Sequence, residues 1–264
     1  MRYLLQYLPV LFLMHSSLYG QIVQPLPNAH AHNDYEHNRP LFDALAQGFT
    51  SIEVDVYLVD DEIYVYHDLP KTVSPNRTLR KLYLEPLEQR IQQNGGQVYA
   101  AYEVTFFLMI DIKKNGPAVY QKLKEQLQPY QSMLTTYKGK NKIPGPVTIF
   151  LSGDRPIKTL LSESNRLMAL DGRPKDIGKG ISADYMPVVS TNYNHHFSWN
   201  GEGEMPTKEW RKLRSLTANV HSEGKRIRFW GTPDKPAVWD KLLDAQVDLI
   251  NTDDLVGLRK FLKP

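Results

Sequence analysis

The sequence contains no cysteine, no dense block of lysine and arginine, and no apolar run of the roughly 20 residues that a membrane-spanning helix needs. The absence of cysteine excludes disulfides, thiolate zinc sites, iron–sulfur clusters and a cysteine nucleophile. The 32 Lys and Arg residues nearly balance the 29 Asp and Glu residues, so nucleic acid is not expected as a partner. With 264 residues, 41% of them hydrophobic, the chain has the composition of a globular protein.

Residues 1–20 are typical of a segment for export rather than of a folded domain. Arg2 precedes an apolar stretch from Leu4 to Leu13, and small or polar residues follow from Ser16 to Gly20. A positive start, a short hydrophobic middle and a small-residue end indicate a secretory signal peptide. We therefore expect a secreted or periplasmic protein with no stable membrane span after cleavage. An uncleaved anchor is the alternative.

Residues 21–264 are expected to form one domain in which strands alternate with helices. The strand-like runs are Pro27–His32, Ser51–Val59, Glu62–His67, Phe106–Ile112, Val147–Ser152, Val188–Thr191, Arg226–Gly231 and Val247–Asn251. The helix-like stretches are Pro40–Gln47, Leu79–Gln93, Pro117–Gln128, Thr207–Glu223, Lys235–Ala245 and Leu255–Phe261. This alternation predicts parallel strands joined by crossover helices.

Eight strands in about 240 residues predict an α/β protein with a (β/α)₈ TIM barrel. A doubly wound open sheet is the alternative, although no glycine-rich turn follows the first strand. The segment Glu163–Met186 is rich in Gly and Lys and is expected to be a long loop. The number of subunits cannot be predicted from the sequence.

Ionisable residues follow the ends of several expected strands, which is where a barrel enzyme builds its site. The first strand leads into His30-Ala-His32-Asn33, and the third ends at His67. Glu53 and Asp55 are two residues apart, so they share one face of their strand. Two like charges that point into a barrel are costly unless a cation or proton compensates them.

A further acid, Asp111, ends the wholly apolar run Phe106–Ile110. Each of these pieces has a structural explanation when taken alone: a solvated edge strand for Glu53 and Asp55, a turn for His67, and a helix N-cap for Asp111. Their co-occurrence at successive strand ends favours a functional site. Three carboxylates suit a hard divalent cation, Mg²⁺ or Ca²⁺. Two histidines beside a phosphate can act as base or nucleophile and as acid.

The set His32-Asn33, Glu53-x-Asp55, His67-Asp68 and Asp111-x-Lys113 resembles the phospholipase-C-like phosphodiesterase barrels. These include glycerophosphodiester phosphodiesterases, phosphatidylinositol-specific phospholipases C and spider-venom-type phospholipases D. The runs His30–Tyr35, Pro40–Leu45, Ser51–Val56, Phe229–Asp234 and Asp248–Asp253 are similar to the branch of the fungal "altered inheritance of mitochondria" protein-six family and its secreted bacterial homologues.

This resemblance implies a role for each matching residue. It makes His32 and His67 the catalytic pair, and we favour His32 as the base or nucleophile and His67 as the acid. It assigns one divalent cation, Mg²⁺ or Ca²⁺, to Glu53, Asp55 and Asp111. It assigns contacts with the substrate to four further residues: Asn33, Lys113, Arg228 and Trp230.

The expected substrate is a small-molecule or lipid phosphodiester, such as a glycerophosphodiester or a phospholipid headgroup. Glycerophosphodiesterases usually have His-Arg-Gly where this chain has His32-Asn33-Asp34, and Glu where it has Asp111. Lys113 or Arg228 would have to supply the phosphate contact of the missing arginine. Neither the headgroup nor the choice between hydrolysis and cyclisation follows from the sequence.

Two other functions are compatible with the same residues. His30-Ala-His32 also resembles the opening motif of amidohydrolase and PHP-type metal hydrolases, in which both histidines bind metal. In that case His195 or His196 and Asp253 would supply further ligands, but Glu53 and Asp55 would have no explanation. The second alternative is a catalytically silent barrel that binds a ligand, which would not need two histidines and three acids.

Overall fold

The computed structural model describes residues 23–139 and 141–263, and within them eight parallel strands form a closed barrel. In ring order the strands are β1 (Leu26–Ala31), β2 (Phe49–Val59), β4 (Phe106–Ile112), β7 (Val147–Gly153), β9 (Met168–Gly172), β10 (Val188–Asn192), β11 (Arg226–Trp230) and β12 (Leu249–Thr252). Pairing of β1 with both β2 and β12 closes the ring. The predicted (β/α)₈ barrel is confirmed. The predicted signal peptide lies outside the described residues.

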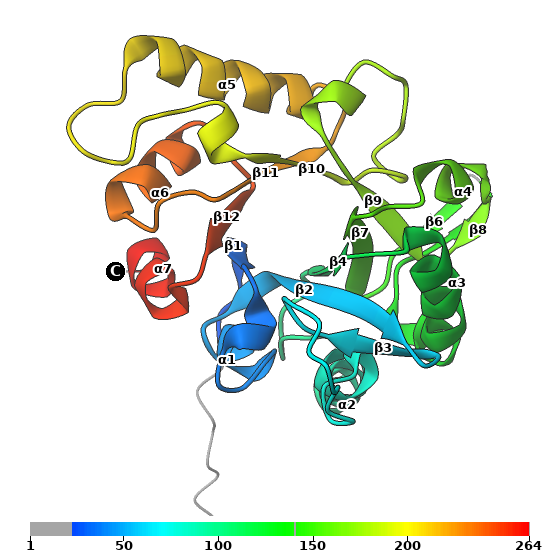
Figure 1. Cartoon of the computed structure of the whole chain (residues 1–264). Helices are drawn as coiled ribbons and strands as arrows, with labels where there is room; N and C mark the ends of the chain where they lie inside the picture. The colour runs from blue at the N-terminus through cyan, green and yellow to red at the C-terminus, as the bar shows by residue number, and fades with distance from the viewer. Residues whose placement is uncertain (1–22, 140, 264) are drawn as a thin grey trace, which may run out of the picture.

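Helices surround this ring on its outer side (Figure 1). They are α1 (Phe42–Ala46), α2 (Glu85–Gln93), α3 (Gly116–Leu127), α4 (Ile157–Ser162), α5 (Thr207–His221), α6 (Pro236–Asp244) and α7 (Leu255–Leu262). A π-helical turn, η2 (Arg80–Leu84), leads into α2, and a 3-10 turn, η1 (Asp34–Glu36), follows β1. A small antiparallel sheet of β5 (Thr136–Lys138), β6 (Asn141–Ile143) and β8 (Asn165–Arg166) lies beside the barrel. Each described helix is too short or too polar to cross a bilayer.

The predicted number of barrel strands, eight, is correct, but one of the strands expected in the barrel lies outside the ring. The run Glu62–His67 forms β3 (Glu62–Val65), which pairs antiparallel with β2. A two-residue turn of Asp60 and Asp61, with φ of 45° and 65°, joins the two strands. Such a turn makes a hairpin, whereas parallel strands need a crossover of a dozen or more residues.

The missing eighth strand is β9, in the segment that was expected to be a loop. Residues Met168–Gly172 are all buried and pair with β7 and β10. Gly172 is needed here for close packing, because a Cβ atom on it would lie within 2.4 Å of the Met186 sulfur. The glycines and lysines of the segment Glu163–Met186 led to the wrong prediction, since glycine usually marks a turn.

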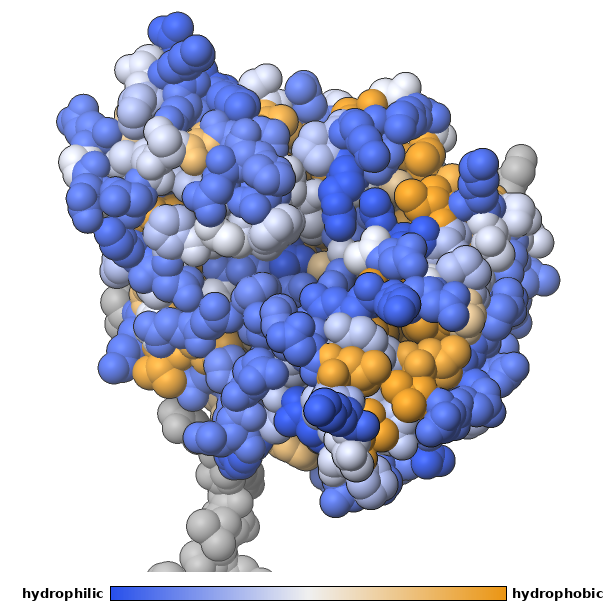
Figure 2. All heavy atoms as spheres, in the orientation of Figure 1, coloured by the Kyte–Doolittle hydropathy of each residue, from blue (hydrophilic) through white to orange (hydrophobic). Residues whose placement is uncertain are grey.

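The core has two parts, because successive side chains along each strand point alternately toward the outer helices and into the barrel. Outward-facing residues such as Ile52, Val54 and Val56 pack against the helices in the main cluster. A smaller cluster inside the barrel consists of Phe107, Met109, Phe150, Ala169, Val188 and Leu249. Above this apolar layer, the inward positions closer to the carboxyl ends of the strands are polar. Hydrophilic residues also prevail around the centre of the face seen along the barrel (Figure 2).

Candidate active site

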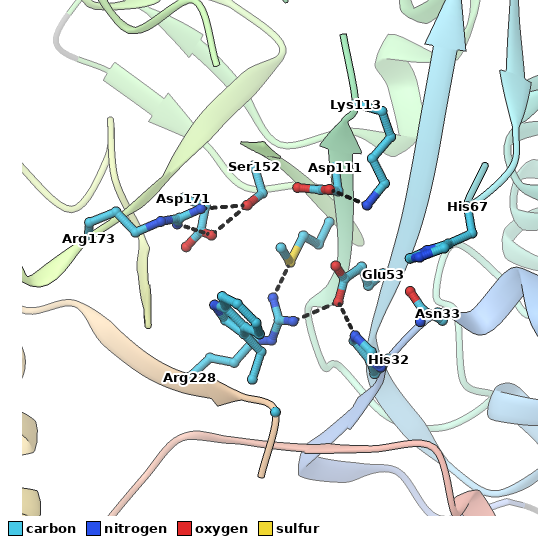
Figure 3. A pocket seen from close by; sticks show the side chains of 13 residues that line it. His32, Asn33, Glu53, His67, Asp111, Lys113, Ser152, Asp171, Arg173 and Arg228 are labelled. Atoms are coloured by element: carbon cyan, nitrogen blue, oxygen red, sulfur yellow. Dashed lines mark hydrogen bonds and ion pairs between the residues drawn. The ribbon is translucent and has the colours of Figure 1, made fainter. Parts of the chain in front are cut away.

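A cavity of about 450 Å³ lies at the carboxyl ends of the barrel strands. Eight of the nine residues singled out from the sequence line it, and the ninth, Asp55, lies buried behind them. The lining residues are His32, Asn33, Glu53, His67, Met109, Asp111, Lys113, Ser152, Asp171, Arg173, Arg228, Trp230 and Gly231. Figure 3 shows their side chains converging from separate strands. The structure thus brings the sequence candidates together in one place.

Three carboxylates meet at one side of this cavity. Asp55 and Asp111 are register partners on the neighbouring strands β2 and β4, and Glu53 faces the same way two residues before Asp55. One oxygen from each of the three lies within 4.8 Å of the other two. The buried Asp55 Oδ1 atom has no hydrogen-bond partner among the described residues. A set of oxygen donors with a spare buried lone pair fits a hard divalent cation.

The ammonium group of Lys113 lies between two of these acids. Its Nζ atom is 2.7 Å from Asp55 Oδ2. It is 2.9 Å from Asp111 Oδ2, a contact that Figure 3 shows. Burial by itself would lower the pKa of Lys113, but the two carboxylates raise it above its ordinary value. Burial raises the pKa of Asp55, although Lys113 and the Tyr35 hydroxyl oppose this effect. Lys113 therefore stays protonated and compensates negative charge at the acids.

A second internal cation, Arg228, neutralises Glu53. Its guanidinium comes from β11, is 1% exposed and donates to Glu53 Oε2 over 2.6 Å and to Asn251 Oδ1 over 3.0 Å. Burial would raise the pKa of Glu53, but the charge of Arg228 and the His30 ring, whose Nε2 atom is 3.6 Å from Oε2, hold it well below its usual range. Glu53 is therefore an ionised carboxylate in the interior of the barrel, as a metal ligand must be.

Both candidate catalytic histidines are oriented by a carboxylate at their Nδ1 atoms. His32 Nδ1 is 2.8 Å from Asp253 Oδ1, and His67 Nδ1 is 3.0 Å from Asp55 Oδ2. Burial lowers the pKa of His32, but the hydrogen bond with Asp253 and the charge of Glu53 outweigh this and raise it above its ordinary value. In each ring the Nε2 atom remains for proton transfer, which is the arrangement that general acid–base catalysis needs.

A polar wall formed by Ser152, Asp171 and Arg173 was missed in the sequence. Ser152 Oγ donates to Asp171 Oδ2 over 2.9 Å, and Arg173 bonds to both residues. Asp171 and Arg173 lie at the end of β9, in the segment expected to be a loop. The signal was present, because Met168-Ala-Leu-Asp171 is an apolar run that ends in an acid, just as Phe106–Asp111 is.

The alternative metal site built on His30 and His32 does not assemble among the described residues. His30 is fully buried, its Nδ1 atom is 2.7 Å from Ser51 Oγ, and burial lowers its pKa to about 3. His196 Nε2 is 2.9 Å from Thr191 Oγ1, and the His195 ring lies edge-on to Trp230. The described part of the chain yields one group of three metal-binding side chains, the acids at 53, 55 and 111.

Comparison with known proteins agrees with this geometry. Residues 20–171 match the AIM6-like phosphodiesterase domain, and residues 226–255 match the glycerophosphoryl diester phosphodiesterase family. The "altered inheritance of mitochondria protein 6 homolog" of Arthroderma benhamiae is 28% identical over 262 residues, which cover 88% of this chain and 82% of the relative. "Altered inheritance of mitochondria protein 6" of Eremothecium gossypii is 30% identical over 274 residues, which cover 90% and 70% of the two chains.

A solved structure has the same fold. The glycerophosphodiester phosphodiesterase from Agrobacterium tumefaciens superposes with a TM-score of 0.51 at 16% sequence identity, and the match covers 89% of this chain and 99% of that one. At this identity the likeness establishes the barrel and leaves the chemistry to the residues themselves. The resemblance stated from the sequence motifs is confirmed.

Proposed function

This chain belongs to the AIM6-like phosphodiesterase family, and from that premise we propose that it is a metal-dependent phosphodiesterase. The observation that carries the proposal is the placement of two carboxylate-oriented histidines in one cavity with three converging acids. The acids Glu53, Asp55 and Asp111 would hold one divalent cation, Mg²⁺ or Ca²⁺. When bound, such a cation polarises a phosphoryl oxygen and compensates its charge.

The chain's own residues divide the remaining work. In the proposed reaction His32 Nε2 takes the proton of the attacking hydroxyl, from water or from the substrate itself, as the new phosphorus–oxygen bond forms. The Asp253 carboxylate stabilises the imidazolium that results. His67 donates a proton to the leaving oxygen as its bond to phosphorus breaks. Asp55 keeps the His67 ring in place through Nδ1.

Cationic and amide groups around the cavity would bind the substrate. Lys113 would contact the phosphate, as would Asn33, and both line the cavity. Trp230, which is 38% exposed, offers an aromatic face to the organic part of the diester. Arg228 is largely committed to Glu53 and Asn251, so its support for the phosphate would be electrostatic. The proposed substrate is a small-molecule or lipid phosphodiester, and the headgroup is open.

Export completes the proposal. Residues 1–20 have the pattern of a secretory signal peptide, so we place the enzyme outside the cytoplasm, either secreted or in a periplasm. Fractionation of cells that express the full chain tests this, together with the mass of the mature protein. Mature protein confined to the cytoplasm, with residues 1–20 retained, would contradict it.

Turnover of bis-p-nitrophenyl phosphate with Mg²⁺, Ca²⁺ or Mn²⁺ tests the proposed activity. The wild type should release nitrophenol, His32→Ala and His67→Ala should each lose about 100-fold or more, and EDTA should remove the activity. His221→Gln is the matched control, because His221 also pairs with a carboxylate, Asp248, but does not line the cavity. Absence of turnover over a broad panel of diesters with metal present would favour the binding-only alternative.

A further inference from the structure

The proposed reaction leaves two charged side chains of the cavity without a task, and they are paired with each other: Asp171 and Arg173. Arg173 follows β9, which is the fifth strand of the ring when β1 is counted as the first. It therefore stands across the barrel from β1, which leads into His32. Figure 3 shows it bonded to Ser152 and Asp171, on the side of the cavity opposite His32 and His67. Neither proton transfer nor the three acids involve it.

The guanidinium of Arg173 is held rigidly by groups at the ends of β7 and β9. NH1 donates to Asp171 Oδ2 over 2.5 Å and to the Gly172 carbonyl over 2.8 Å, and NH2 donates to Ser152 Oγ over 3.1 Å. Asp171 is fully buried and Ser152 nearly so. The Arg173 backbone N–H is fixed as well, because it donates to Asp176 over 3.0 Å. A preorganised arginine fork loses little entropy when it binds a planar or tetrahedral anion.

Positive charge exceeds negative charge at this wall. Arg155 also approaches Asp171 and donates to its backbone carbonyl, so two guanidinium groups lie beside one carboxylate, which is paired with Arg173. The nearby Asp176 is already paired with Lys179 over 3.1 Å. Burial lowers the pKa of Arg155, and the charge of Arg173 lowers it further, while Asp171, Asp176 and the Asp111 carboxylate oppose this. An anion bound beside Arg173 would relieve this repulsion.

The exposed part of Arg173 provides the place for such an anion. Its side chain is 27% exposed and lines the same cavity as the candidate catalytic groups. Arginine offers only hydrogen-bond donors, while the acceptor next to it, Asp171, is shielded from solvent. The surface presented to a ligand is thus a donor surface with excess positive charge, which suits a phosphate or carboxylate.

We propose that Arg173 forms a second anion-binding subsite, which takes an acidic substituent, phosphate or carboxylate, on the organic part of the diester. This inference rests on the proposed phosphodiesterase function and adds a substrate class to it. Strands β4 and β9 are two steps apart in the ring, so the subsite lies roughly 10 Å from the acids on β4. The preferred substrate therefore carries two anionic groups, the scissile phosphate and a second one within that distance.

Two matched pairs of diesters test the subsite and distinguish the two kinds of anion. Glycerophosphoinositol 4-phosphate differs from glycerophosphoinositol by one phosphate, and glycerophosphoserine differs from glycerophosphoethanolamine by one carboxylate. Binding is measured by calorimetry in the His32→Ala protein, so that turnover does not interfere. The more anionic member of at least one pair should bind about tenfold more tightly or better, and Arg173→Gln should remove that preference.

Two further variants keep the test conclusive. Lys175→Gln is the charge-matched control, since Lys175 is exposed, lies two residues from Arg173 and does not line the cavity. This variant should prefer the more anionic diester as strongly as the His32→Ala protein does. If Arg173→Gln fails to fold, Arg173→Lys retains a partner for Asp171 but loses the fork, and its preference should fall several-fold. Equal affinities within both pairs, or an unchanged preference in the folded Arg173 variant, would overturn the subsite.

Turnover of bis-p-nitrophenyl phosphate by the wild type separates this inference from the proposed function. A protein that cleaves this diester but shows no preference within either pair has the activity without the subsite. A protein that prefers the more anionic diesters but cleaves none has the subsite without the activity.

Discussion

Arg228 and Glu53 form an ion pair across the interior of the barrel, with a distance of 2.6 Å between the guanidinium NH2 and the carboxylate Oε2. The two residues come from strands β11 and β2, 175 positions apart in the chain. Both side chains are almost fully buried. The chain therefore carries its own cation beside a carboxylate that we propose as a metal ligand.

Replacement of Arg228 by Met should show whether the Arg228–Glu53 ion pair and cation binding are coupled. The variant leaves Glu53 buried and without its main counter-charge, so the metal-free protein should lose about 3–5 kcal/mol of unfolding free energy. A divalent cation should recover part of this loss, because it now supplies the missing positive charge. Denaturant unfolding with and without Mn²⁺ measures both effects. Equal stabilisation of wild type and variant by Mn²⁺ would show that Glu53 does not take part in cation binding.

Asp111→Asn tests the acidic set with little risk to the fold, because the Asp111 side chain is 16% exposed. The amide has nearly the same shape but no charge, so cation affinity and diester turnover should both fall about 100-fold or more. Calorimetry with Mn²⁺ and a nitrophenol assay give the two values. A matched Asp61→Asn variant, at an exposed acid paired with Lys122 outside the cavity, should change neither.

Asp253→Asn should act on the reaction through His32. Removing the carboxylate removes the hydrogen bond and charge that help to raise the pKa of His32, so that pKa falls. Because a base works in its neutral form, the acidic limb of the kcat/KM profile should move to lower pH, with a loss of rate of about 10- to 100-fold. An unmoved acidic limb, or a shift of the alkaline limb in its place, would contradict His32 as the base.

Asp34 should make stability depend on pH in a direction opposite to most carboxylates. Burial raises its pKa to about 6, although it accepts hydrogen bonds from the Leu41 backbone and the Tyr83 hydroxyl. Between pH 4 and 6 the folded chain holds this proton while the unfolded chain releases it. The stabilisation is therefore complete below pH 4 and lost as pH rises to about 6, a change of about 3 kcal/mol.

Asp34→Asn removes that titration and checks its sign. The amide keeps an acceptor for Leu41 and Tyr83, so the fold should persist. Urea unfolding of both proteins from pH 4 to pH 7 gives the comparison. As pH rises from 4 to 7, the unfolding free energy of the Asp34→Asn variant should increase relative to that of the wild type. A constant difference over this range would exclude the raised pKa.

The sequence predicted those parts of the fold whose pattern is local. Strand β4 was predicted to the residue, because a short uninterrupted apolar run with two aromatic residues is typical of a buried strand. The role of the run Glu62–Val65 was wrong, since pairing direction depends on the Asp60–Asp61 turn rather than on strand propensity. Strand β9 was missed because it lies in a segment rich in Gly and Lys, where Gly172 serves packing against Met186 rather than a turn.

The candidate site was predictable as a set of residues but not as a network. Alternation on β2 showed that Glu53 and Asp55 share a face. No sequence pattern shows that Lys113 reaches Asp55 or that Arg228 reaches Glu53, because these contacts depend on register and on closure of the ring. The partnership of His32 with Asp253 joins residues 221 positions apart and needs the fold as well.

The proposal that three acids hold one divalent cation is tested most directly by a crystal soaked in Mn²⁺ and measured at the manganese absorption edge. We predict one anomalous peak in the cavity, about 2.0–2.6 Å from an oxygen of each of Glu53, Asp55 and Asp111. A peak at another group of residues, or none there at a concentration that supports turnover, would contradict the account.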